Sequence, residues 1–244
     1  MTMNFKAENK AALLDTLQSI DVKGPLLDGS RRKENTEPYA MAHLLSSLAE
    51  RGSRLTFPLE LTHRKPPHDK PDFLLSMGGK KIGIEHTDAR PENETRKDVL
   101  RRKEEIGPSV CFLAPAEPGE PRRSAKQLKA EIEANDSGVG WGDQDNTDRK
   151  WSDVMLSVIN AKQEKLQTPE FSRYDEDWLL IRDAWPFPSV DLQNATGHLF
   201  SQIRARTIEL EFDRVFIISS SDRGPLCEIG ENGFTLHPRN DLWL

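Results

Sequence analysis

Two carboxylates on either side of a glycine pair carry the strongest chemical signal in this chain. Asp72 and Glu85 flank Gly78-Gly79, a dipeptide that strongly favours a two-residue β-hairpin turn. Counting outward from such a turn places Asp72 directly opposite Glu85, with Cβ atoms about 5 Å apart on one face. Two like charges so close destabilise a sheet unless a divalent cation lies between them or they share a proton. A three-residue loop would instead put the two acids on opposite faces.

Two helices are expected to bring further charged residues to this pair. At 100° per residue, Glu37 and Lys162 each lie within about 20° of the middle of the apolar stripe of their helix. Charged side chains seldom face a core unless they are paired, so both residues are candidates for the same site. The alternatives are a first-turn acid favoured by the helix dipole for Glu37 and a lysine reaching solvent near a helix end for Lys162.

The elements that must position these residues follow from apolar periodicity and from capping and turn signals. We expect helices over residues 36–52, 150–166 and 196–212, with Thr36 and Thr196 as N-caps. We expect strands over residues 55–61, 72–77, 81–87, 178–184, 214–220, 227–229 and 234–236. Pro58 argues that the first of these strands is an edge or bulged strand. This order predicts an α/β fold with a mixed central sheet flanked by helices and a carboxy-terminal hairpin.

The domain organisation predicted from the sequence is simple. Residues 1–35 carry a short helical pattern and are expected to form an amino-terminal appendage. Residues 36–244 are expected to form one domain with an insert at about 88–148. His63 is expected in a loop, and the side chain of His86 should point to the face opposite Glu85 and be packed there.

Composition excludes several classes of protein. The chain has 244 residues, with 34 Lys and Arg against 40 Asp and Glu, for a net charge of −6. That balance excludes a protein that coats nucleic acid by bulk charge. No apolar run approaches the ~20 residues that span a bilayer, so we expect no membrane contact. Two cysteines exclude a disulfide scaffold, and the first ten residues lack a secretory signal, which together predict a cytoplasmic protein.

Charge is unevenly distributed along the chain. Ten basic and seven acidic residues lie between Arg90 and Lys129, in an otherwise acidic sequence. Clusters between Arg96 and Lys129 could contact the phosphates of a nucleic acid. A solvated helix face is the alternative explanation.

The acidic pair and its setting resemble the PD-(D/E)XK nuclease superfamily, which has the restriction-endonuclease-like fold. The resemblance rests on residues 71–72 (Pro-Asp), a short hairpin, and residues 84–87 (Ile-Glu-His-Thr). In that superfamily the Asp opens one strand, and the second acid and a lysine close the next strand. A preceding helix often supplies another Glu, which here would be Glu37. The similarity extends over roughly residues 36–220.

This resemblance implies a metal-dependent nuclease that hydrolyses phosphodiester bonds, with DNA as the expected substrate. Mg²⁺ or Mn²⁺ would be held by Asp72, Glu85 and the backbone carbonyl of His86. Glu37 would act behind these ligands or on a second metal ion. The basic insert would follow the nucleic-acid backbone. The oligomeric state stays open, with a homodimer as one option.

One position departs from the superfamily pattern. Thr87 stands where the lysine should be and cannot supply a positive charge. Some members of the superfamily take this lysine from the next helix, and Lys162 is the best substitute here. Lys165 and Lys81 are weaker candidates.

Two other interpretations remain open. Thr87 and the net negative charge favour a catalytically inactive nuclease-fold protein that serves as a binding or regulatory module. The similarity could also be accidental, in an unrelated α/β interaction protein; a three-residue loop at Gly78 would support that reading.

Overall fold

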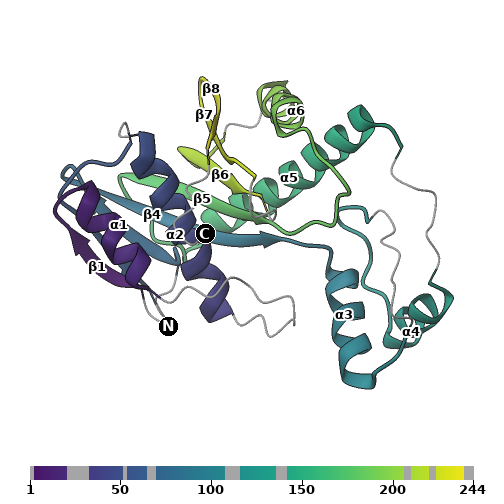
Figure 1. The fold of residues 1–244 in the computed structure, drawn as a ribbon. Helices are drawn as coiled ribbons and strands as arrows, with labels where there is room; N and C mark the ends of the chain where they lie inside the picture. Colours follow the sequence, from purple (N-terminus) through teal and green to yellow (C-terminus); the bar gives the residue numbers. More distant parts are fainter. Residues whose placement is uncertain are drawn as a thin grey trace.

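An eight-stranded mixed sheet forms the centre of the molecule (Figure 1). The computed structural model describes residues 3–20, 33–51, 54–64, 70–107, 116–135, 142–205, 210–219 and 224–238. The strands follow one another across the sheet in chain order. They are β1 (Asn4–Ala7), β2 (Leu59–His63), β3 (Phe73–Met77), β4 (Lys80–Ala89), β5 (Glu176–Asp183), β6 (Arg214–Ile218), β7 (Leu226–Gly230) and β8 (Gly233–His237). Strands β4, β5 and β6 run parallel, and all other neighbours pair antiparallel.

Helices cover both faces of this sheet, as the α/β prediction required. They are α1 (Lys10–Ser19), α2 (Lys33–Arg51), α3 (Glu92–Glu104), α4 (Ala125–Ala134), α5 (Gln144–Leu166) and α6 (Leu192–Ala205). Helices α1 and α2 share one apolar core with one face of the sheet, and α5 and α6 share a second core with the other face. In Figure 1, α3 and α4 project beyond the end of the sheet. None of the described helices is both long and apolar enough to cross a membrane.

The side chains of β5 show why helices must pack on both faces of the sheet. Trp178 and Leu180 lie in the core beneath α1 and α2, whereas Leu179 and Ile181 lie in the core beneath α5 and α6. Successive residues of a strand point to opposite faces, so a strand covered on both sides reads as a continuous apolar run. The prediction of a central strand at this place is confirmed.

The β3–β4 hairpin has the predicted register. Met77 pairs with Lys80, and the ladder continues as far as Phe73 opposite Ile84. Gly78 and Gly79 have φ angles of 56° and 77°, in the left-handed region that glycine enters without steric cost. One further step along this register sets position 72 opposite position 85.

The helix boundaries differ from the predicted ones at three amino-terminal ends. Helix α5 begins at Gln144 because the Asp143 side chain accepts a hydrogen bond from the Asn146 N–H at 2.8 Å. Helix α6 begins at Leu192, where the Asp191 carboxylate accepts N–H groups of the first turn. The predicted cap Thr196 is therefore wrong, and it lies buried inside α6.

Helix α2 begins at Lys33, three residues before the predicted cap Thr36. Pro38 therefore lies in the second turn, where it removes one backbone hydrogen bond without ending the helix. Helix α6 ends at Ala205, and residues 210–213 are not helical, so the predicted end at 212 is also wrong.

Strand β2 is an interior strand, contrary to the edge or bulge expected from Pro58. The strand begins at Leu59, directly after that proline, so no ladder hydrogen bond is lost. Its second neighbour is β1, which pairs through Asn4 opposite Thr62. The amino-terminal segment, expected as an appendage, thus supplies the edge strand of the same sheet.

Candidate active site at the end of β4

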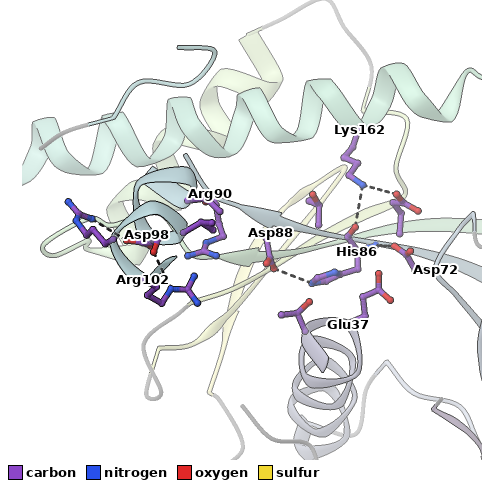
Figure 2. Close-up of a pocket in the computed structure, with 14 residues that line it drawn as sticks. Glu37, Asp72, His86, Asp88, Arg90, Asp98, Arg102 and Lys162 are labelled. Atoms are coloured by element: carbon purple, nitrogen blue, oxygen red, sulfur yellow. Dashed lines mark hydrogen bonds and ion pairs between the residues drawn. The ribbon is translucent and has the colours of Figure 1, made fainter. Parts of the chain in front are cut away.

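A cavity of about 700 Å³ opens where β4 leaves the sheet. Its walls come from α2, α3, α5 and the ends of β3 and β4, and Figure 2 shows the residues that line it. All four residues singled out as catalytic candidates lie on this wall: Glu37, Asp72, Glu85 and Lys162. Elements far apart in the chain therefore converge on the place that the hairpin predicted.

Asp72 and Glu85 hold different partners within this cavity. The Asp72 Oδ2 atom accepts a hydrogen bond of 2.7 Å from the backbone N–H of His86. The Glu85 Oε1 atom lies 2.7 Å from Lys162 Nζ. The other carboxylate oxygen of Glu85, Oε2, is buried and accepts no hydrogen bond from the part of the chain that the structure describes. A buried carboxylate oxygen in this state is costly unless a cation or a donor reaches it.

Lys162 reaches the site from α5, as its place on the apolar stripe predicted. Besides Glu85, its ammonium group donates to the backbone carbonyl oxygen of His86 at 3.2 Å. The one cation thus joins two of the oxygen atoms proposed as metal ligands. Lys81 and Lys165 are exposed and do not line the cavity, so neither takes this place.

Glu37 lies on the opposite side of β4 from Lys162, so the two side chains do not approach the carboxylate pair from the same side (Figure 2). Its Oε2 atom is 3.0 Å from Nε2 of His63. His63 is the last residue of β2, is buried, and stacks on Phe73 with ring centroids 4.4 Å apart. The loop role expected for this histidine is therefore wrong, because β2 begins later and extends further than its apolar pattern suggested.

The side chain of His86 occupies the face opposite Glu85, as predicted from strand alternation. It is buried, and this burial lowers the pKa of His86 to about 4, although the neighbouring Asp88 carboxylate acts to raise it. The imidazole is therefore neutral at pH 7. Its Nε2 atom lies 3.7 Å from Asp88 Oδ1, too far for a hydrogen bond.

Sequence reasoning missed an ion pair between a buried arginine and a half-buried aspartate at the same end of the sheet. Arg182 on β5 contacts both oxygens of Asp88 on β4, at 2.8 and 2.6 Å. The two residues are direct partners in the parallel ladder. The available signal was an arginine within the apolar strand at 178–184, since a buried arginine requires a carboxylate partner. The Arg182 guanidinium thus supplies a counter-charge to Asp88, with one hydrogen bond to each carboxylate oxygen.

The remaining wall of the cavity is basic. Arg90 follows the last residue of β4, and Arg101 and Arg102 come from α3. Arg101 pairs with Asp98 at 3.2 Å, and Arg102 donates through Nε to the Asp98 carbonyl oxygen. The cavity therefore has an acidic end at Asp72 and Glu85 and a cationic end beside α3.

Many other cations of the basic insert serve the packing of α3 against α4. The ion pairs are Lys97 with Glu94 and Glu131, Arg123 with Glu120 and Glu131, Arg122 with Glu92, and Lys129 with Glu104. Lys97 is buried, whereas Arg122 and Glu92 are exposed, and exposed pairs of that kind contribute little to stability individually. They do neutralise the insert locally, so its net positive charge overstates the charge it can offer to a phosphate.

The fit of a divalent metal ion can be tested on the oxygens present. Among the described residues, no three His, Cys, Asp or Glu side chains gather into a ready metal-binding group. The predicted set needs only two carboxylates and one carbonyl, which are hard oxygen ligands of the kind that Mg²⁺ takes together with water. Glu85 lines the cavity, and its buried Oε2 atom has no hydrogen-bond donor among the described residues, which fits a cation as its partner.

Comparison of the chain with known protein families, characterised proteins and solved structures gives no match.

Proposed function

We propose that this protein is a metal-dependent nuclease of the PD-(D/E)XK type, with DNA as its expected substrate. One observation carries the proposal: Lys162 on α5 meets Glu85 and the His86 carbonyl beside Asp72, within a cavity whose far wall is basic. Lys162, on a helix, would thereby supply the positive charge that Thr87 cannot. A cytoplasmic location, expected from the sequence, would give the enzyme access to DNA.

Hydrolysis would add water across one P–O bond of the phosphodiester. Asp72, Glu85 and the His86 carbonyl would hold Mg²⁺ or Mn²⁺, which would polarise the phosphoryl oxygen and lower the pKa of a bound water. Lys162 would orient the attacking water and stabilise the negative charge that develops on the phosphate. The water oxygen would bond to phosphorus, the leaving oxygen would depart and gain a proton, and the water would lose one.

A catalytically inactive binding module is the second candidate, and one contact favours it. The Lys162 ammonium already satisfies Glu85 Oε1 and the His86 carbonyl without any ligand. In such a protein this ion pair would simply hold α5 to β4. The two functions differ in whether a metal ion binds and whether a phosphodiester bond is cleaved.

The deciding experiment measures metal binding and cleavage on the same samples. Calorimetric titration with Mg²⁺ and Mn²⁺ is paired with plasmid cleavage for the wild type, Asp72→Asn and Glu85→Gln. The matched control is Glu133→Gln, an exposed acid on α4 outside the cavity. We expect the wild type and the control to bind the metal ion and to cleave the plasmid. In both site variants we expect cleavage to fall by at least 100-fold.

Two results would contradict the nuclease proposal. Wild-type protein that binds no metal and cleaves no nucleic acid would favour the binding module. Cleavage that persists in Asp72→Asn and Glu85→Gln would place any nuclease chemistry elsewhere in the chain. Metal binding without cleavage of DNA would redirect the assay to RNA.

A further inference from the structure

Arg90 is the cation of the cavity wall for which the structure describes no partner. Its Nε atom is buried and makes no hydrogen bond, and no ion pair to its guanidinium is found among the described residues. Arg90 as a whole is half-buried, so the rest of its guanidinium group can still meet a ligand in the cavity, and the planar donor fork of a guanidinium matches a phosphate or a carboxylate.

The acids that could have neutralised Arg90 are engaged elsewhere. Asp88 is held at both oxygens by Arg182. Asp98 contacts Arg101. In Figure 2, Arg90 lies between α3 and Asp88. Arg90 therefore has no counter-charge among the described residues, and it lines a cavity large enough for a ligand.

The position of Arg90 along the chain separates it from the carboxylate pair. Five residues of nearly extended backbone, at about 3.3 Å each, put its Cα roughly 16 Å beyond that of Glu85. A group bound by Arg90 is therefore distinct from the one at Asp72 and Glu85. A ligand that reaches both must carry more than one anionic group along its length, as a nucleic-acid backbone does.

Helix α3 supplies a matching wall for such a ligand. Thr95, Asp98, Val99 and Arg102 recur at helical spacing and line the cavity, whereas Lys97 on another side of α3 pairs with Glu131 of α4. Val99 is the large apolar side chain that the described structure leaves most exposed, at 49 %. An apolar contact beside two arginines suits the sugar of a nucleotide next to its phosphate.

We infer that Arg90 binds a backbone phosphate other than the one that is cleaved, and so holds the nucleic acid across the cavity. This inference rests on the proposed function, since it names a second contact of the same substrate. Arg90 would be a substrate-binding residue, with no part in the bond-breaking step.

Binding without catalysis tests the inference. Fluorescence anisotropy with a labelled DNA oligonucleotide is measured in EDTA for the wild type, Arg90→Gln, Arg90→Lys and Arg149→Gln. Arg149 is the matched control, because it lies outside the basic insert, is exposed, pairs with Asp145 and does not line the cavity. We expect about a tenfold loss of affinity for Arg90→Gln, a smaller loss for Arg90→Lys, and less than a twofold change for the control.

Salt dependence and a modified oligonucleotide identify the lost contact as a phosphate. Loss of one phosphate contact should reduce the slope of log K against log salt by about 0.7 to 0.9. Replacing single phosphates by neutral methylphosphonates should weaken wild-type binding at one position and leave Arg90→Gln unaffected there. Thermal melting of each variant establishes that the fold is retained.

The outcomes separate the two proposals. Arg90→Gln that binds and cleaves like the wild type overturns the inference and leaves the nuclease proposal standing. Normal binding by Asp72→Asn, with weakened binding by Arg90→Gln, supports the inference even if no cleavage is found. Wild-type protein that binds neither DNA nor RNA overturns both.

Discussion

Lys162 and Thr87 together show how one charge can reach the site from a different element. Thr87 lies on β4 two residues after Glu85 and lines the cavity from the same face. Lys162 reaches this place from α5, with its ammonium 2.7 Å from Glu85 Oε1. If only the location of the positive charge matters, a lysine on the strand should replace the lysine on the helix.

Relocating the lysine tests this idea. Lys162→Met should reduce single-turnover plasmid cleavage by at least 100-fold, because the charge that stabilises the transition state is lost. The double variant Thr87→Lys/Lys162→Met should cleave at least tenfold faster than Lys162→Met. Lys165→Met, an exposed lysine one turn along α5, is the control and should change cleavage less than twofold.

The same variants have a stability readout that does not depend on catalysis. Lys162→Met removes the cation from a buried carboxylate and should lower the free energy of unfolding by about 1–3 kcal/mol in urea denaturation. If Lys162→Met cleaves like the wild type, Lys162 is a structural partner of Glu85 only.

At the scale of elements, Asp183 joins helix α5 to the sheet. It ends β5, accepts the indole N–H of Trp151 at 2.8 Å, and accepts the backbone N–H of Trp185 at 3.0 Å. Burial raises the pKa of Asp183 to about 6, although both N–H donors act to lower it. The folded protein therefore binds a proton at Asp183 more readily than the unfolded chain does.

This shift predicts the sign of a pH dependence. Between about pH 4 and pH 6 the folded state keeps the proton and the unfolded state does not, so the contribution of Asp183 to stability falls as pH rises. Relative to Asp183→Asn, the wild type should lose about 2 kcal/mol of unfolding free energy from pH 4 to pH 7. The variant has a constant deficit, because an amide has only one acceptor oxygen for two donors.

Urea denaturation at several pH values measures this difference. Asp153→Asn, an exposed acid on α5, is the control. A difference between wild type and Asp183→Asn that stays constant from pH 4 to pH 7 would contradict the prediction.

For the whole molecule, the amino-terminal segment is part of the sheet and its core. Strand β1 protects one edge of β2, and Met3, Leu13 and Leu17 are buried in the core beneath α1 and α2. β1 is itself the edge strand, and with four residues it leaves a shorter open edge than the five-residue β2 would. Truncation of these residues should not leave an intact domain.

Substitution tests this without deleting the strand. Leu17→Ala should lower the free energy of unfolding by about 2–5 kcal/mol, because it opens a cavity in a packed core. Leu14→Ala, on the partly exposed side of the same helix, should cost less. Equal and small effects in thermal and urea denaturation would show that α1 is a dispensable appendage.

Several parts of the fold and site were predictable because the signals are local. Two glycines with positive φ set the register of the hairpin, and that register alone placed Asp72 opposite Glu85. Helical periodicity directed Lys162 inward. Strand β1 was not predicted, because its four residues are too few for a periodic pattern. The first turns of α5 and α6 were not predicted either, because these helices begin at aspartate caps that lie outside their apolar stripes.

The sequence by itself determined which way each side chain points from its own strand or helix, since that direction depends only on the period of the backbone. Only the tertiary structure decided which elements meet. It set Glu37 and His63 on the other side of β4 from Lys162, paired Asp88 with Arg182 across a parallel ladder, and left Arg90 in the cavity. These contacts join residues far apart in the chain, and they follow from how helices pack on the two faces of the sheet, which no local pattern encodes.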